Sequence, residues 1–187
     1  MKIYKEKSKG FTLIETFVAI TILLIAVLGP MSLFARAIRD GIYAKNQITA
    51  FYLAQEGLEL AVNYKDSNVA AGFPWLSGLS GLPDCSRPDS CIIEFSNDGR
   101  IRASSISDLE EAVLNQDANG IYSYDVGGTP SLFKRTIQIV PFQDVDGNQF
   151  EARILVSVVW NDRPDLANLV STERKTVLET IIYNIQS

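Results

Sequence analysis

Apolar and polar residues follow different patterns in successive parts of the chain, and the first pattern is an uninterrupted apolar run. Residues 16–35 carry no formal charge, and many of them are large and aliphatic or aromatic. An α-helix needs about twenty such residues to cross the hydrocarbon layer of a bilayer. The run therefore predicts a membrane-spanning helix near the amino terminus, in which Gly29-Pro30 would weaken or kink the backbone locally.

A helical spacing of apolar residues follows this run. Between residues 48 and 62, apolar side chains recur every three or four positions, at Ile48, Phe51, Ala54, Leu58 and Val62. The pattern predicts that the helix continues to about Tyr64, which makes it about 80 Å long from Phe11. It also predicts that these five side chains pack against a sheet.

Alternation of apolar and polar residues dominates the carboxy-terminal half. The clearest predicted strand is 150–160, where one face holds Phe150, Ala152, Ile154, Val156, Val158 and Trp160. Further strands are predicted at 92–95, from 101 after the turn 97–99, at 121–124, 133–140 and 175–184, with a short helix or irregular segment at 108–114. Asp146-Gly147 predicts a tight turn between 133–140 and 150–160. The predicted fold class is α+β, a long amino-terminal helix packed on an antiparallel meander.

Charge sets the expected orientation of the apolar run in a membrane. The leader, residues 1–10, contains four lysines against one glutamate, and a positive flank of this kind stays in the cytoplasm while the carboxy-terminal part is exported. The formal net charge is −5, and it becomes −8 when residues 1–10 are removed. Such an acidic chain is a poor candidate for binding nucleic acid. A conventional secretory signal is the alternative, but its apolar region is shorter and ends in a small-residue cleavage site.

Residues 66–91 form a region rich in Gly, Pro and Ser, in which no regular spacing survives. Its large apolar side chains are expected to lie against the domain: Phe73, Trp75, Leu76, Leu79 and Leu82. Cys85 and Cys91 are the only cysteines, and on the exported side of a membrane they are expected to form a disulfide. A ring this small would stabilise the fold by about 2 kcal/mol. The alternative is two free thiols.

Residues 9–15, Lys-Gly-Phe-Thr-Leu-Ile-Glu, join the basic leader to the apolar run. This segment resembles the processing site of type IV pilin-like proteins, a family of pilins, minor pilins, and the pseudopilins of type II secretion and competence. The resemblance implies that prepilin peptidase cuts between Gly10 and Phe11 and methylates the new amino group of Phe11. It also implies that Glu15 guides assembly by pairing with the amino terminus of a neighbouring subunit. Both charges are costly in lipid, and pairing would neutralise them.

A second, shorter segment also resembles part of this family. Residues 52–60, Tyr-Leu-Ala-Gln-Glu-Gly-Leu-Glu-Leu, are similar to a segment of minor pilins of the pilus-modification type and of the secretion pseudopilin I type. The alternative is an amphipathic helix face on which Glu56 and Glu59 are solvated. Arg135 and Arg153, on predicted strands, would pair with carboxylates for about 0–1 kcal/mol each if exposed.

The residues that enzymes commonly use are scarce in this chain. It contains no histidine, which removes the usual general base and the commonest metal ligand, and Gly127-Gly128 lacks the context of a nucleotide-binding loop. Asp144, Asp146 and Asn148 resemble a calcium loop, but the spacing fits a hairpin turn better. Glu110, Glu111 and residues 162–165 are most simply solvated surface. We expect no enzyme activity and no cofactor; a membrane-anchored hydrolase using carboxylates has no paired acidic residues to support it.

These patterns define an expected organisation and function. Residues 1–10 are a leader, 11–35 a transmembrane or filament-core helix, and 36–187 an exported domain with a helical part (36–65), a loop region (66–91) and a sheet (92–187). The expected function is that of a minor pilin or pseudopilin, a structural subunit of a type IV pilus or type II secretion-like filament.

Its expected partners are prepilin peptidase, other subunits, an inner-membrane assembly platform and, before assembly, membrane lipid. It would cross the inner membrane once and then enter an extracellular or periplasmic filament. The alternatives are a competence pseudopilin and an adhesin or ligand-binding tip protein that makes contact through the loop around Phe73 and Trp75.

Overall fold

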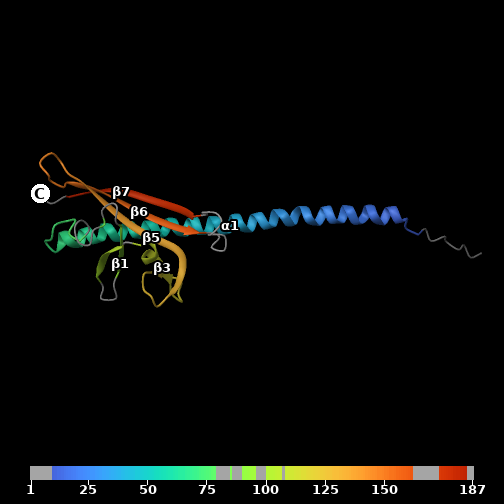
Figure 1. Cartoon of the computed structure of the whole chain (residues 1–187), viewed down its shortest axis with the longest axis horizontal. Coiled ribbons are helices and arrows are strands. Elements are labelled where there is room, and N and C mark those ends of the chain that lie inside the picture. Colours follow the sequence, from blue (N-terminus) through green and yellow to red (C-terminus); the bar gives the residue numbers. More distant parts are fainter. Residues whose placement is uncertain are drawn as a thin grey trace, which may run out of the picture. The chain divides into compact units, whose positions relative to one another are not determined.

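The computed structural model describes residues 10–78, 85, 90–95, 100–106, 108–161 and 173–184. These residues form one long helix and one antiparallel sheet, which confirms the predicted α+β arrangement (Figure 1). The helices are α1 (Leu13–Ala70) and the short 3-10 helix η1 (Leu109–Ala112). The strands are β1 (Ser90–Phe95), β2 (Ile101–Ile106), β3 (Val113–Gln116), β4 (Tyr122–Ser123), β5 (Thr129–Phe142), β6 (Glu151–Asn161) and β7 (Glu173–Tyr183).

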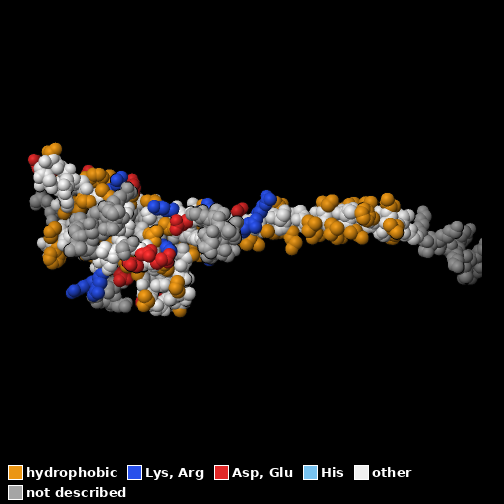
Figure 2. Space-filling view, viewed as in Figure 1, with side chains coloured by type: hydrophobic (Ala, Val, Ile, Leu, Met, Phe, Trp, Pro, Cys, Tyr) orange, Lys and Arg blue, Asp and Glu red, His pale blue; other side chains and the backbone are white. Residues whose placement is uncertain are grey.

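Two compact units divide the chain, residues 1–44 and residues 45–187, and α1 contributes to both. In the first unit, α1 exposes large apolar side chains, and hydrophobic atoms cover its visible face (Figure 2). Its most apolar 18-residue window has a mean hydropathy of 2.5 and no buried residue, so by length and composition it is a candidate membrane span. The helix continues through Pro30. The local kink expected there stays a prediction.

The face that α1 buries in the second unit overlaps the predicted one only in part. Of the five apolar residues expected to pack on the sheet, Ala54 is buried, and Leu58 and Val62 are partly buried and pack against the core. Ile48 and Phe51 remain 58% and 47% exposed. The buried positions lie roughly 100° further around the helix axis. They are Asn46, Ala50, Leu53, Ala54, Gly57, Ala61 and Lys65. Most of these side chains are small, which lets the helix backbone approach the sheet closely.

Gly57 marks the closest approach of α1 to the sheet. A Cβ atom added at this position would lie 2.9 Å from Cδ of Arg135 and 2.9 Å from Cγ1 of Val156. Both atoms belong to side chains that are almost completely buried on β5 and β6. The periodicity of large apolar residues located this face only in part, because the closest packing here depends on small residues such as Gly57.

Strand β5 is the centre of the sheet, which is not the simple meander that we predicted. One edge of β5 pairs with β6 along residues 133–142, and β6 pairs in turn with β7. The other edge pairs with β3 near its beginning and with β1 at Cys91↔Ile137. Only β5, β6 and β7 therefore form a sequential meander. At 14 residues, β5 is long enough to meet partners on both edges.

The core lies between α1 and the sheet and contains most of the predicted face of β6. Ala152, Ile154, Val156, Val158 and Trp160 are buried, as the alternation predicted, whereas Phe150 precedes the strand and is 56% exposed. Trp75 and Leu76 from the predicted loop region also belong to the core. Phe73 does not, since it is 58% exposed.

Several predicted segments are changed or fall outside the description. Helix α1 ends at Ala70 instead of residue 64, and the segment predicted at 108–114 forms η1 followed by the start of β3. The leader residues 1–9, Leu79 and Leu82, the turn at 97–99 and the acidic segment 162–165 lie outside the described residues.

A Gly57→Ala substitution tests the close contact between α1 and the sheet. Overpacking at a fixed backbone costs about 1–3 kcal/mol, against a gain of up to about 1 kcal/mol in helix propensity. We expect a net loss of about 1–2 kcal/mol in the free energy of unfolding. The measurement is thermal unfolding of the full chain in detergent micelles, followed by the fluorescence of Trp75 and Trp160, which are both buried in this unit.

Gly41→Ala is the matched control for this test. Gly41 lies in α1, and within the described residues no non-local heavy atom comes within 4 Å of a Cβ built there. The control variant should unfold no earlier than the unmodified chain. Equal stability of the Gly57→Ala and Gly41→Ala variants would contradict the close packing.

Candidate functional site

The segment around the predicted processing site precedes α1 and is exposed. The helix begins at Leu13, so Gly10 and Phe11 lie outside it. Phe11 is 80% exposed, and among the described residues no heavy atom other than those of the chain neighbours lies within 4 Å of a Cβ built on Gly10. A peptidase needs an accessible backbone, and Gly10 and Phe11 are exposed and lie outside the helix.

Thr12 and Glu15 form the start of α1. The side-chain oxygen of Thr12 accepts a hydrogen bond from the backbone N–H of Glu15 at 3.3 Å, and the Thr12 carbonyl accepts one from Thr16 at 3.2 Å. Thr12 is thus the N-cap, and Glu15 occupies the third helical position. Threonine followed by glutamate at this spacing is the pattern of a capping box, and a carboxylate there is favoured by the helix dipole.

The sequence interpretation missed the N-cap at Thr12, whose side chain accepts from the backbone N–H of Glu15. The pattern Thr-x-x-Glu was visible in residues 12–15. An assembly role and a capping role are compatible, but an experiment on Glu15 has to separate them.

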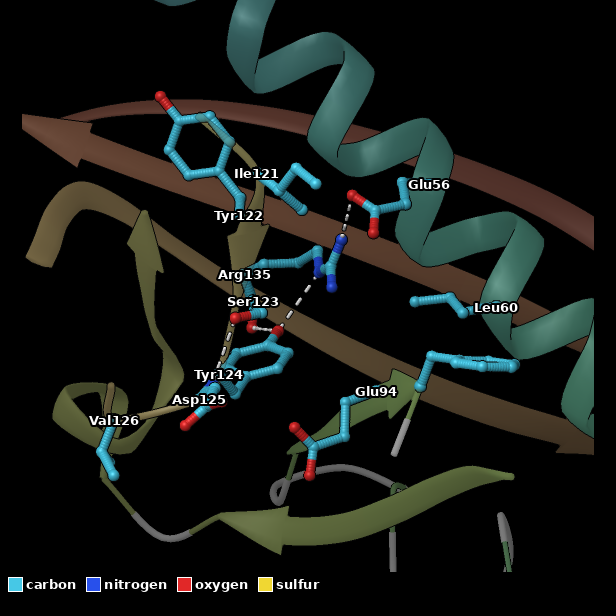
Figure 3. Close-up of a pocket in the computed structure, with 11 residues that line it drawn as sticks. Glu56, Leu60, Glu94, Ile121, Tyr122, Ser123, Tyr124, Asp125, Val126 and Arg135 are labelled. Carbon is cyan, nitrogen blue, oxygen red and sulfur yellow. Dashed lines mark hydrogen bonds and ion pairs between the residues drawn. The ribbon is translucent and has the colours of Figure 1, made fainter. Parts of the chain in front are cut away.

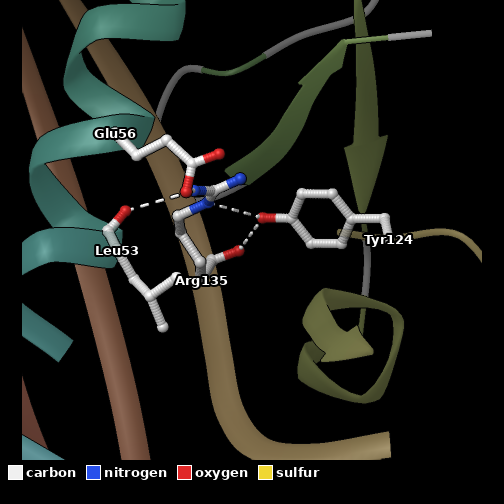
Figure 4. Close-up of polar contacts among 4 residues, drawn as sticks. All are labelled: Leu53, Glu56, Tyr124 and Arg135. Carbon is white, nitrogen blue, oxygen red and sulfur yellow. Dashed lines mark hydrogen bonds and ion pairs between the residues drawn. The ribbon is translucent and has the colours of Figure 1, made fainter. Parts of the chain in front are cut away.

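Arg135, on β5, joins the sheet to α1 (Figure 4). Its Nη1 donates to the backbone carbonyl of Leu53 at 3.1 Å and lies 3.1 Å from a carboxylate oxygen of Glu56. Its Nε donates to the hydroxyl of Tyr124 at 3.2 Å, and this hydroxyl donates to the backbone carbonyl of Arg135 at 2.8 Å. The guanidinium carbon lies 5.3 Å from the centre of the Tyr124 ring.

Burial makes this arginine different from the surface cation that its strand position suggested. Its side chain is only 2% exposed, whereas that of Glu56 is 49% exposed. Glu56 is exposed, as the alternative of a solvated helix face predicted, but it also pairs with Arg135. A buried charge is tolerated when it is paired and hydrogen-bonded, and α1 supplies both a carboxylate and a carbonyl.

The pKa values of the two buried partners keep them in the states that this geometry needs. Burial raises the pKa of the Tyr124 phenol, which outweighs the opposite effect of the Arg135 charge, so Tyr124 stays neutral. Burial alone would lower the pKa of Arg135, but Tyr124 and Glu56 more than offset it and the pKa is raised. At neutral pH a charged guanidinium therefore faces a neutral phenol.

A pocket of about 500 Å³ lies beside Arg135 (Figure 3). Its lining comes from α1, β1, β5 and the segment 121–126. Polar and apolar side chains both contribute: Glu56, Leu60, Glu94, Phe95, Ile121, Tyr122, Ser123, Tyr124, Asp125, Val126 and Arg135. No feature of the sequence alone connected these residues, because they come from four separate segments.

Cys85 and Cys91 are joined by a disulfide in the structure, with both residues fully buried. Cys91 lies on β1 opposite Ile137 of β5, and the carbonyl of Cys85 accepts a hydrogen bond from the backbone N–H of Ile139 at 2.9 Å. The bridge therefore holds two short segments beside the same part of β5.

The Asp144 loop has the hydrogen bonds of a turn. One carboxylate oxygen of Asp144 accepts from the backbone N–H groups of Asp146 and Asn148, and the other accepts from the Asn148 side chain. Gly147 adopts a φ of 83°, as a tight turn requires. These bonds lower the pKa of Asp144. Among the described residues no group of three or more His, Cys, Asp or Glu side chains could hold a metal ion.

Comparison with known proteins adds one finding at the amino terminus. Residues 5–29 match the model of a family described as the prokaryotic N-terminal methylation motif. The match includes the predicted processing site, the cap at Thr12 and much of the apolar helix. This match supports a type IV pilin-like protein. Neither the curated proteins nor the solved structures gave a match.

The motif supports a pilin-like subunit that is processed by prepilin peptidase and assembles with other pilin subunits. The apolar α1 fits a membrane-anchored pilin. This family is structural rather than enzymatic. In the pilin-like chain, the Arg135 contacts lie in the second unit, outside the matched residues.

A double-mutant cycle tests whether Arg135 and Glu56 act together in this pilin-like protein. Arg135→Met leaves the Leu53 carbonyl and the Tyr124 hydroxyl without their donor and should lower the free energy of unfolding by about 2–3 kcal/mol. Glu56→Gln should cost about 1 kcal/mol, because Glu56 is half exposed. The double variant should lose less than the sum of the two, which thermal unfolding in detergent measures.

Lys134→Met is the control for this cycle. Lys134 is the preceding residue of β5 and forms an ion pair with Glu110, whose side chain is 73% exposed. An exposed pair contributes only about 0–1 kcal/mol. Strict additivity of the Arg135 and Glu56 effects, or an equal loss in the Lys134 variant, would argue against a special role for the buried arginine.

Proposed function

We propose that this pilin-like chain is a minor pilin or pseudopilin, a structural subunit of a type IV pilus or a type II secretion-like filament. Prepilin peptidase cuts it between Gly10 and Phe11 and methylates the amino group of Phe11. Residues 11–35 hold the subunit in the inner membrane, with the amino terminus in the cytoplasm and the second unit outside. The observation that carries the proposal is the methylation motif at the start of an apolar helical segment, residues 13–35, that contains no buried residue.

Exposure of the apolar helix supports a subunit that moves from lipid into a filament. Within the described structure, residues 13–35 of α1 contain no buried residue, so this surface needs another apolar environment to cover it. Lipid tails and the apolar side chains of other helices provide nearly equal environments. Transfer from the bilayer to a filament of packed helices is then close to neutral in hydrophobic free energy.

Glu15 gives this transfer a direction and a register in our proposal. Cleavage places a positive amino group at Phe11, four residues before the carboxylate of Glu15. A carboxylate in lipid costs roughly 2.5–3.5 kcal/mol on insertion scales, and pairing with the amino terminus of a neighbouring subunit would remove much of that cost. Neutral side chains along the helix leave many subunit registers nearly equal in energy, whereas this pair favours one.

Mass spectrometry of the purified native protein tests the processing step. We expect the mature chain to begin at Phe11 and to carry one added methyl group on its amino terminus. The cleavage should be lost in a Gly10→Val variant, because a β-branched side chain would replace the exposed, unsubstituted Gly10. A native chain that begins at Met1, or beyond residue 30, would refute the proposed processing.

Three substitutions at the start of α1 separate assembly from capping. Glu15→Gln removes the charge but retains a residue that can complete a capping box, and Thr12→Ala removes the cap but retains the charge. We expect Glu15→Gln and Glu15→Ala to insert and to be processed, but to enter filaments poorly. Immunoblotting of sheared filaments and of membranes measures both steps.

Thr12→Ala is the control for this series, since it should cost about 1 kcal/mol of helix stability and leave assembly largely intact. If Thr12→Ala impaired assembly as strongly as Glu15→Gln, capping would account for the effect. Normal incorporation of the Glu15→Gln variant would exclude the carboxylate from the mechanism.

A further inference from the structure

The pocket beside Arg135 contains a donor that the protein itself does not use. The printed contacts of Arg135 employ Nε and Nη1, and among the described residues Nη2 has no hydrogen-bond partner. In Figure 3 this nitrogen points away from Glu56 and Tyr124, toward the part of the pocket between Leu60 and Glu94. A fixed guanidinium thus presents two N–H donors to the pocket from a side chain that is only 2% exposed.

Nη2 is not sealed inside the protein. Across the described residues, the only fully buried side-chain nitrogen or oxygen atom without a partner is Nε of Arg153. Nη2 of Arg135 therefore opens into the pocket, where an acceptor from outside the chain can reach it. The remaining guanidinium nitrogens are held by Leu53, Glu56 and Tyr124, so the direction of this donor is fixed.

The charge of the pocket restricts the class of ligand. Three carboxylates line it, from Glu56, Glu94 and Asp125, against the single cation Arg135. Glu56 pairs with Arg135, which leaves two net negative charges. One Asp125 oxygen accepts from the backbone N–H of Gly127. Arg102 lies opposite Glu94 in the β1–β2 register but does not line the pocket. An anionic ligand is disfavoured here, and a cation is favoured.

Apolar side chains provide the other part of the lining. Leu60 lies on α1, Phe95 ends β1, and Ile121 precedes β4. Phe95 and Ile121 are 64% and 63% exposed, so their surfaces are accessible from solvent. Long aliphatic stems that carry a terminal charge, as in lysine and arginine, cover apolar surface of this kind while the charge reaches a carboxylate.

We propose that this pocket binds a basic peptide segment from a partner protein, with a backbone carbonyl accepting from Nη2 of Arg135 and a lysine or arginine side chain pairing with Glu94 and Asp125. The aliphatic stem of that side chain lies against Leu60 and Phe95. Charge complementarity selects this occupant over an acidic or neutral one. The inference is independent of the proposed filament role, because every residue it uses lies in the second unit, outside the methylation motif.

Isothermal titration calorimetry of the full chain in detergent micelles tests this site with short capped peptides. The probe is acetyl-Ala-Lys-Ala-amide, and the matched peptide replaces Lys with norleucine, which removes the charge and retains the stem. We expect the Lys peptide to bind at least about tenfold more tightly, since a charged hydrogen bond contributes about 1.5–3 kcal/mol. Added salt should weaken this binding.

Two substitutions place the binding in the pocket. Glu94→Gln should weaken the Lys peptide by about tenfold, because it removes one of the two pocket carboxylates proposed to meet the lysine. Glu111→Gln is the control, as Glu111 is an exposed glutamate on η1 that does not line the pocket. Neither substitution removes a contact of Arg135, so both variants should fold normally, which thermal unfolding verifies.

Three outcomes would overturn the inference. These are no binding of the Lys peptide at millimolar concentration, equal binding of the Lys and norleucine peptides, and equal loss in the Glu94→Gln and Glu111→Gln variants. None of these results depends on processing or on filament assembly, so the failure of one proposal is distinguishable from the failure of the other.

Discussion

A buried arginine connects the helix of this pilin-like protein to its sheet, and much of the second unit is arranged around it. The guanidinium of Arg135 is removed from water, which is costly, and α1 offsets that cost with the carbonyl of Leu53 and the carboxylate of Glu56. These contacts need a short distance between helix and strand. Gly57 provides that distance, because a side chain there would meet both Arg135 and Val156. The small residues on the buried face of α1 allow the contacts of Arg135, and these contacts in turn hold α1 against β5.

The same helix follows two packing rules in its two parts. Between residues 13 and 35 its side chains are large, apolar and exposed, whereas the buried positions between residues 46 and 65 include Ala50, Ala54, Gly57 and Ala61. The first part satisfies its backbone internally, as a lipid environment requires, and leaves its side chains for an outside apolar phase. In the second part most of the buried side chains are small, and this brings the helix backbone close to the sheet. The first part is distinguished by its high mean hydropathy of 2.5 over 18 residues, and the buried face of the second part is distinguished by its small side chains.

Local patterns in the sequence predicted what depends on local structure. Alternation over residues 150–160 located β6 and its buried face from Ala152 to Trp160, and the charge-free run located the apolar part of α1. Predictions that depend on distant partners were less successful. The central place of β5 follows from pairing with three strands, and the burial of Arg135 follows from a helix about eighty positions earlier in the chain. A lysine or arginine on a strand carries no local sign of such a partner. The N-cap at Thr12, in contrast, was readable from the Thr-x-x-Glu spacing and was overlooked.

The geometry that holds Arg135 also determines which of its donors remains available. A guanidinium has five N–H groups, and one helix turn together with one phenol occupies only the Nε and Nη1 side. Closing the remaining side with protein atoms would need another acceptor from β1, whose nearest pocket residues are Glu94 and Phe95. Phe95 has no acceptor in its side chain, and among the described residues Glu94 makes no bond to Arg135. The pocket is thus a consequence of the way the helix is attached. The guanidinium of Arg135 fixes α1 to the sheet through Nε and Nη1, and its Nη2 stays available, in a fixed direction, beside the carboxylates of Glu94 and Asp125. Preorientation lowers the entropy cost of binding, because Arg135 loses no side-chain freedom when an outside carbonyl reaches it.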